Sequence, residues 1–256
     1  MNRDSYTNKP NNELEVIIHL EQSINSREFD LDKKNLIQRD DFDKVIGWID
    51  SRLQELPEAG ESIDKLSKNK ERFHDTISIL GSRGSGKTSF LLSILKYYRL
   101  KSEVETIDVI DPTLIEEKGH IFLTIISQIK HCVDSKIDNW NSENSNCSIK
   151  QIWRDRLNDL ALGIPSIDGI SKGFSDTSWQ DAEYIMDRGL KSVGSARKLQ
   201  ENFDRFVELS LQILGKKMFI IALDDIDIDF CKGWPVLETI RKYLTTPRIT
   251  ILLSGD

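Results

Sequence analysis

The sequence has little cysteine and no long apolar run. Its three cysteines, Cys132, Cys147 and Cys231, lie far apart and form neither a Cys-x-x-Cys motif nor a cluster with paired histidines. This scarcity argues against a disulfide framework and against a structural zinc site. No segment reaches the roughly 20 apolar residues of a membrane span, and the polar start of the chain lacks the apolar core of a secretion signal. We therefore expect a soluble, cytoplasmic protein that has no membrane partner.

The sequence also lacks an excess of positive charge. It has 35 Lys and Arg residues against 42 Asp and Glu residues, a formal net charge of −7, and a pI near 5.3. This balance disfavours a surface built to neutralise nucleic-acid phosphates, although a local basic patch would still allow nucleic acid as a partner. Two short basic clusters are better interpreted as solvated surface. They are Lys65, Lys68, Lys70 and Arg72, and then Lys191, Arg197 and Lys198.

Hydrophobic periodicity predicts an α/β fold. With 38% hydrophobic residues, the 256-residue chain is able to bury a core as one large domain or two small ones. Short apolar runs alternate with segments whose apolar residues recur every three or four positions, the pattern of a mostly parallel sheet flanked by helices. The predicted strands are residues 76–80, 104–110, 218–223 and 249–253. The predicted helices are residues 40–56, a segment from about 87, 113–129, 199–214 and 236–244.

These elements suggest how the chain is organised. Residues 1–72 are predicted to form a mainly helical N-terminal region, and residues 73–256 a core with an insertion at about 133–200. Thr113 and Glu116 have the spacing of a capping box, which would start a helix directly after Asp111-Pro112.

One motif specifies the chemistry. The string is Gly81-Ser82-Arg83-Gly84-Ser85-Gly86-Lys87-Thr88, which satisfies G-x-x-x-x-G-K-[ST] at every position. It follows a predicted strand and precedes a predicted helix, the context that separates a phosphate-binding loop (Walker A) from a chance glycine-rich turn. Glycines let successive amides point at phosphate oxygens, and the helix N-terminus adds the positive end of its dipole. We expect Lys87 to bridge the β- and γ-phosphates, the Thr88 hydroxyl to bind Mg²⁺, and Ser89 to contact the α-phosphate.

An acidic motif follows the most apolar of the predicted strands. Residues 218–223 run directly into Asp224 and Asp225, as expected of a strand that delivers carboxylates to a magnesium nucleotide (Walker B). We assign Asp224 to the Mg²⁺ ion and Asp225 to the catalytic base or water-positioning acid. That acid is often glutamate, and aspartate reaches about one methylene less far, so hydrolysis would be slow or would need a neighbouring group.

Further aspartates in this region raise the alternative of a calcium loop. Asp225, Asp227 and Asp229 have the i, i+2, i+4 spacing of such a loop. Its sixth position would be Phe230 instead of glycine, and its twelfth Val236 instead of glutamate. Calcium is therefore disfavoured, and Asp227 and Asp229 are better interpreted as solvated loop acids.

A polar residue follows the last predicted strand. Ser254 stands where ring-forming ATPases hold a polar side chain near the γ-phosphate, called sensor 1, and either Ser254 or Asp256 would fit that role, with a plain turn as the alternative. The string Leu253-Ser254-Gly255 suggests an ABC signature, but it follows the acidic strand instead of preceding it. The sequence has no guanine-selecting Asn-Lys-x-Asp motif after the loop. ATP is therefore the expected nucleotide.

Arginines are of interest because a finger from a neighbouring subunit would accelerate phosphoryl transfer. Arg241 and Arg248 lie between the third and fourth predicted strands, and Arg83 lies in the glycine-rich loop. For each of them an ordinary surface arginine is the simpler interpretation.

The order of these motifs resembles the core of the AAA+ and STAND class of P-loop ATPases over residues 75–256, apart from the predicted insertion. More narrowly, residues 84–91, 108–118 and 223–227 resemble bacterial anti-phage ATPases such as the ATPase subunit of the RADAR system, and this narrower resemblance rests mainly on residues 108–118. It implies a homo-oligomeric ring, Mg²⁺-dependent ATP hydrolysis and an effector partner such as an adenosine deaminase. It also implies a fifth strand, a helical lid and a second sensor, so we expect the chain to be truncated before the lid.

Two rival functions stay open beside a defence ATPase. A nucleic-acid remodeller, such as a loader or repair ATPase, would show nucleic-acid-stimulated turnover with a steep salt dependence. A module that binds ATP without hydrolysing it is compatible with the aspartate at position 225 and with a missing lid.

Overall fold

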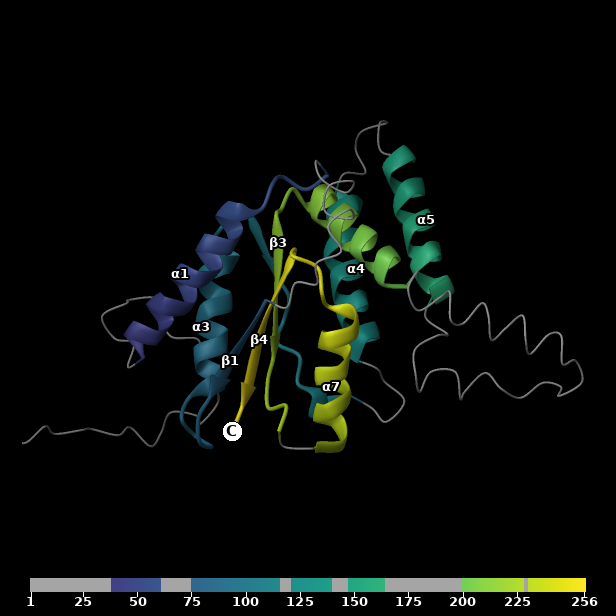
Figure 1. Cartoon of the computed structure of the whole chain (residues 1–256). Coiled ribbons are helices and arrows are strands. Elements are labelled where there is room, and N and C mark those ends of the chain that lie inside the picture. Colours follow the sequence, from purple (N-terminus) through teal and green to yellow (C-terminus); the bar gives the residue numbers. More distant parts are fainter. Residues whose placement is uncertain (1–37, 61–74, 116–120, 140–146, 164–198, 228–229) are drawn as a thin grey trace, which may run out of the picture.

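A sheet of four parallel strands forms the centre of the computed structural model, which describes residues 38–60, 75–115, 121–139, 147–163, 199–227 and 230–256. The strands are β1 (Thr76–Leu80), β2 (Val104–Thr106), β3 (Met218–Leu223) and β4 (Ile249–Gly255). Their order across the sheet is β1-β4-β3-β2, and each neighbouring pair is parallel. The carboxyl ends of the strands therefore share one edge, the lower edge in Figure 1. The predicted α/β class with a parallel sheet is confirmed.

Helices cover both faces of this sheet (Figure 1). On one face lie α1 (Arg39–Glu55) and α3 (Lys87–Arg99). On the other lie α4 (Ile121–Asn139), α5 (Cys147–Gly163), the helix at residues 199–214, and α7 (Phe230–Tyr243). The chain crosses the sheet from β1 to β2 and then returns through β3 to β4. Because parallel crossovers are right-handed, this reversal of direction places the connecting helices on opposite faces.

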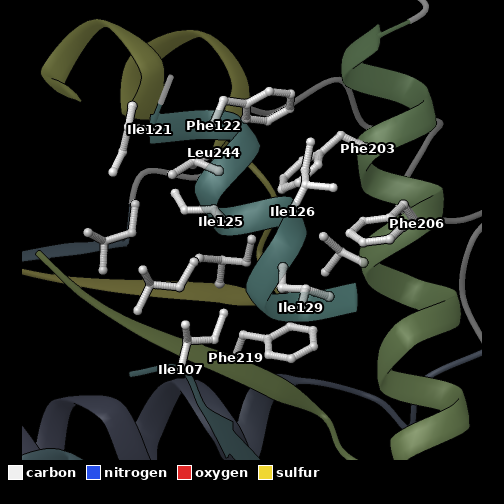
Figure 2. Packing of buried hydrophobic residues seen from close by; sticks show 14 of the residues in the cluster. Ile107, Ile121, Phe122, Ile125, Ile126, Ile129, Phe203, Phe206, Phe219 and Leu244 are labelled. Carbon is white, nitrogen blue, oxygen red and sulfur yellow. The ribbon is translucent and has the colours of Figure 1, made fainter. Parts of the chain in front are cut away.

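The side chains of β3 divide alternately between two hydrophobic cores. All six residues of this strand are buried. Met218, Ile220 and Ala222 pack with α1 and α3. Phe219, Ile221 and Leu223 pack with α4, α7 and the 199–214 helix. Figure 2 shows the second of these cores, with side chains of α4 and of the 199–214 helix above Phe219. A strand buried on both faces reads as a continuous apolar run, which is why the sequence predicts it so clearly.

The predicted first helix is confirmed as α1, and it belongs to the same body as the sheet. Its apolar stripe packs on α3, where the rings of Phe42 and Phe90 meet edge to face with centroids 6.2 Å apart. The Tyr98 hydroxyl of α3 donates to Asp50 Oδ1 of α1 at 2.9 Å. The described part of the N-terminal region is therefore one layer of the core.

The helix at residues 199–214 is also confirmed and ends in a Schellman motif. Gly215 has a φ of 70°, a left-handed conformation that glycine adopts without steric cost. The Gly215 amide donates to the Gln212 carbonyl at 3.3 Å, and the Lys216 amide donates to the Leu211 carbonyl at 2.9 Å. Together these bonds satisfy carbonyls that the helix end leaves without partners.

The prediction of a helix that starts at Thr113 is wrong. Asp111 caps the segment instead, because its side chain accepts from the Thr113 amide at 2.8 Å and starts a short 3₁₀ turn, η2 (Pro112–Leu114). The helix α4 is described from Ile121, and Glu116 lies outside the described residues. The preceding strand is also shorter than predicted, since β2 ends at Thr106 and an isolated bridge pairs Ile110 with Leu223.

The described residues of the predicted insertion contribute to the hydrophobic core. The end of α4 and all of α5 lie in it, and their buried residues belong to the cluster that Figure 2 shows in part. Trp153 of α5 stacks on Phe206 with ring centroids 5.3 Å apart, so α5 packs against the 199–214 helix. Residues 61–74 and 164–198 lie outside the described ranges, and both basic clusters lie within these two segments.

Two further findings concern the helices. The last helix, α7, begins at Phe230, earlier than the predicted start at residue 236, and includes Pro235. Pro235 lies in the second turn of this helix, where a proline removes one intrahelical hydrogen bond and its ring crowds the carbonyl four residues earlier. None of the helices that the structure describes is long and apolar enough to cross a membrane.

Candidate functional site

The glycine-rich loop lies between the carboxyl end of β1 and the start of α3, as predicted. Gly84 and Gly86 have φ angles of 83° and 87°, in the left-handed region where other residues are strained. The Ser85 amide donates to the Ser82 carbonyl at 3.0 Å, which closes a turn inside the loop. The Gly81 amide donates to the Gly255 carbonyl at 3.3 Å and fixes the loop to the end of β4.

The start of α3 is suited to an anion. No side chain caps this helix, and the first amides of any helix, here those of Lys87, Thr88 and Ser89, have no acceptor within the helix. The loop from Ser82 to Gly86 is exposed, so a ligand has access to it. Free amide donors and the positive end of the helix dipole are the features that bind phosphate. The residues predicted to bind nucleotide therefore fit a phosphate group.

The Lys87 ammonium reaches across the loop. It donates to the carbonyl of Gly81 and to Oδ1 of Asp256. The pKa of Lys87 is raised above its ordinary value, chiefly by the hydrogen bond with Asp256, and the charges of Asp227 and Asp225 add to this. The lysine of the loop and the acids that follow β3 therefore lie near one another.

A hydroxyl joins the two predicted acids. Ser254 Oγ donates to Asp224 Oδ1 and accepts from the Asp225 amide at 2.9 Å. Asp224 is only 6% exposed and Ser254 is fully buried. The backbone is fixed as well, since the Asp224 amide donates to the Ile110 carbonyl at 3.0 Å and the Ile226 amide to the Ser254 carbonyl at 3.2 Å.

The position of Ser254 differs from the prediction. It lies within β4, paired with Ile79 of β1, instead of after the strand. A hydroxyl has one proton to donate, and that of Ser254 is engaged with Asp224. This arrangement supports a role in positioning Asp224 and Asp225 instead of direct contact with a γ-phosphate.

Asp225 has an unusual backbone and a perturbed carboxyl group. Its φ is 52°, the one positive value among the described residues other than glycine. Aspartate tolerates this left-handed conformation better than glutamate does, which gives a backbone reason for the shorter acid at this position. Burial raises the pKa of Asp225, and the charges of Asp224, Asp111 and Asp227 raise it further, while Lys87 opposes them. A carboxylate with a raised pKa is a better proton acceptor.

The predicted Mg²⁺ ligands are Thr88 and Asp224. Within the ranges that the structure describes, no group of three or more His, Cys, Asp or Glu side chains is placed to hold a metal ion. Mg²⁺ is commonly held by one or two protein oxygens with phosphates and water completing its shell. A hydroxyl and a buried carboxylate therefore fit Mg²⁺ that arrives with a nucleotide. Asp229, the third acid of the disfavoured calcium loop, lies outside the described residues.

Sequence reasoning missed Asp111 as a member of this acidic group. It lies beyond β2 at the carboxyl edge of the sheet, where it caps η2 and contributes to the raised pKa of Asp225. The available signal was its position at the end of a predicted strand, because the carboxyl ends of parallel strands converge at one edge.

Arg248 is not a surface arginine. It is 1% exposed, and its guanidinium donates to both carboxylate oxygens of Glu208 at 2.9 Å. Neither the expected exposed side chain nor an arginine finger fits this burial. Arg83, in the loop, and Arg241, on α7, are exposed as predicted.

No model of a known protein family matches the chain, and no curated protein matches it either.

Proposed function

We propose that the chain is the core of a Mg²⁺-dependent ATPase of the P-loop type. The observation that supports this most strongly is the meeting of the Gly81–Lys87 loop with Asp224 and Asp225 at one edge of the sheet. Their strands, β1 and β3, are separated by β4, whose Ser254 binds both acids. Lys87 is close enough to Asp225 for the two charges to influence each other. A cationic loop facing an acid pair is the arrangement that phosphoryl transfer requires.

The residues divide the work of such a reaction among themselves. The amides at the start of α3 and the Lys87 ammonium would bind phosphate oxygens. Thr88 and Asp224 would hold Mg²⁺, which neutralises charge on those oxygens when it is bound. Asp225, with its raised pKa, would orient a water molecule and accept its proton. Ser254 would keep the two acids in register with the loop.

The wider biological role is proposed from the sequence resemblance. The likeness of residues 108–118 to anti-phage ATPases supports assembly into a ring and action with an effector such as an adenosine deaminase. The acidic net charge of −7 gives no support to a nucleic-acid remodeller.

The test is Mg²⁺-dependent ATP binding and turnover by the full chain. Lys87→Ala is expected to weaken ATP binding about tenfold or more and to abolish turnover. Asp225→Asn is expected to keep binding and to lower turnover about 100-fold or more, because the amide accepts no proton. Asp155→Asn on α5 makes the same acid-to-amide change at an exposed position, and it should alter neither quantity.

Other results of this experiment would support one of the two rival functions or overturn the proposal. Binding that is lost in Lys87→Ala but never accompanied by turnover would support the module that holds ATP without hydrolysing it. Turnover that rises with nucleic acid and falls steeply with salt would support a remodeller. Binding and turnover that survive in Lys87→Ala would overturn the proposal.

A further inference from the structure

The ammonium group of Lys87 has three protein acceptors within 3.5 Å. It donates to Asp256 Oδ1 and to the Gly81 carbonyl, and it approaches the Ser82 carbonyl at 3.5 Å. The Lys87 side chain is only 10% exposed. A phosphate group that is to contact this lysine must therefore replace a partner that is already present.

The backbone at Asp256 is held in place by the sheet. The strand β4 pairs with β1 up to Leu80 and Gly255, and the Gly81 amide continues this pairing by donating to the Gly255 carbonyl at 3.3 Å. Asp256 follows directly, so that its carboxylate faces the loop, although 169 positions in the sequence separate it from Lys87. Figure 1 shows this end of the chain beside the loop between β1 and α3.

The carboxylate itself is free to leave. The Asp256 side chain is 51% exposed, so it regains water when it releases Lys87. An ion pair with one half-exposed partner is weaker than a fully buried pair, and a phosphate group that takes the place of Asp256 keeps the Lys87 charge paired. The charges of Asp225 and Asp227 also act on Lys87. Asp256 is the acid whose side chain accepts a hydrogen bond from the Lys87 ammonium group.

We propose that Asp256 is a latch that occupies Lys87 until a polyphosphate displaces it. The ligand class is a nucleoside di- or triphosphate, whose terminal phosphates compete with the carboxylate for the same ammonium group. Displacement frees Asp256 at the end of β4, the strand that also carries Ser254. This proposal rests on the proposed function. It adds that phosphate binding at the loop is transmitted to β4.

The test compares binding of ATP, inorganic triphosphate and AMP to the full chain by calorimetry, in EDTA so that no metal is involved. Asp256→Asn is expected to tighten binding of ATP and triphosphate by about threefold to tenfold, because the competing charge is gone. AMP has no phosphate that reaches Lys87, so its affinity should not change. Asp227→Asn is the matched control, since it removes a neighbouring charge for which no contact with Lys87 is seen, and its effect should be clearly smaller.

A second measurement does not depend on a ligand. Hydrogen exchange of the loop amides in the nucleotide-free protein is expected to be faster in Asp256→Asn than in the native chain, because one tie between loop and β4 is lost. Asp256→Ala serves the same purpose if the asparagine variant is poorly folded.

The failures of the two proposals are distinguishable. If triphosphate binds, and Lys87→Ala abolishes that binding, but Asp256→Asn changes neither affinity nor exchange, the latch is overturned and the proposed function stands. Equal tightening by Asp227→Asn and Asp256→Asn would also overturn it, since general electrostatics would then suffice. If neither ATP nor triphosphate binds the native chain, in EDTA or with Mg²⁺, the proposed function fails and the latch fails with it.

Discussion

The hydroxyl of Ser254 both donates and accepts, and its two partners are neighbours in sequence. It donates to Asp224 and accepts from the amide of Asp225. The sequence marks Ser254 as a polar residue near the end of a strand, but it does not reveal which group takes its proton. That choice depends on the position of β4 between β1 and β3. The candidate acids were therefore predictable, whereas the bridge between them was not.

Replacing Ser254 with alanine should loosen this acid pair. Ser254→Ala leaves the buried Asp224 carboxylate without its donor, and we expect the free energy of unfolding to fall by about 1–3 kcal/mol. Mg²⁺-dependent ATP affinity should fall as well. Urea unfolding and calorimetry measure the two effects. Ser254→Cys fills similar space with a weaker donor and should lie between the two proteins. An alanine variant as stable as the native chain would show that the bridge contributes little.

Asp204 is a second residue whose environment has a measurable consequence. It lies on the 199–214 helix, and its Oδ1 is buried without a hydrogen-bond partner among the described residues. Burial, with a smaller contribution from the charge of Glu201, raises the pKa of Asp204 from 3.8 to about 7. The folded protein therefore holds this proton more tightly than the unfolded chain does. The protonated Asp204 carboxyl group makes its full contribution to the free energy of unfolding below about pH 4, and this contribution is lost as the pH rises towards 7.

Removal of this charge should stabilise the protein in a pH-dependent way. Asp204→Asn is expected to raise the free energy of unfolding at pH 8, by up to about 4 kcal/mol, because no buried charge then forms. At pH 4 the native chain and the variant should be nearly equal. Denaturant titrations at the two pH values measure this, with Asp155→Asn as the exposed control. A gain of the same size at both pH values would contradict the assigned pKa.

At the scale of elements, α7 packs closely against the backbone of the acidic loop. Gly233 of α7 is buried, and a Cβ atom at this position would lie 2.0 Å from the carbonyl oxygen of Ile226. Real Cβ atoms do not approach an oxygen so closely. The helix and the loop that carries Asp224 and Asp225 therefore cannot move independently at this point.

Gly233→Ala should force these two elements apart. We expect the free energy of unfolding to fall by about 1–3 kcal/mol, as for other overpacked positions, and ATP turnover to fall with it. Gly47→Ala is the matched control, because Gly47 is an exposed position in α1 with no atom within 4 Å of an added Cβ. Alanine there should stabilise the helix by roughly 0.5–1 kcal/mol. Thermal unfolding of both variants measures the contrast, and two variants that behave alike would rule out the clash.

The sequence predicts best those helices and strands whose secondary structure follows from their own pattern of apolar residues. The strand β3 is apolar on both faces, and α1 has an uninterrupted apolar stripe. The helix start at Thr113 was mispredicted because two caps compete there. Asp111, followed by Pro112 at the first position of the turn, is the stronger start signal. The helix α5 is hidden in the sequence by its polar residues, since only a few of its side chains are buried.

At the scale of the whole molecule, Arg248 ties together segments that are distant in sequence. Its guanidinium pairs with Glu208 and also donates to the Pro57 and Glu58 carbonyls, at 2.6 and 3.2 Å. Glu208 also accepts from the Gly60 amide at 2.8 Å. The start of β4, the 199–214 helix and the segment after α1 therefore meet at one buried ion pair. No local pattern reveals such a partner, which is why the sequence suggests a surface arginine.

Breaking this ion pair should be costly. Glu208→Ala leaves the Arg248 charge buried with only carbonyl partners, and we expect a loss of about 3–5 kcal/mol in the free energy of unfolding. The control is Glu55→Ala, which removes the exposed partner of Arg52 and should cost less than about 1 kcal/mol. Denaturant unfolding compares the two. Equal losses would mean that burial does not distinguish these pairs.

The position of β4 in the sheet also constrains when the site forms during synthesis. The strands β1 and β3 leave the ribosome before the strand that separates them, because β4 follows both in the chain. Until β4 inserts, the loop at residues 81–86 lacks its hydrogen bond to the Gly255 carbonyl, and Asp224 and Asp225 lack the hydroxyl that joins them. Non-local pairing of this kind forms late in folding. A nascent chain that ends before residue 249 is therefore expected to carry every residue of both motifs and still have no assembled nucleotide site.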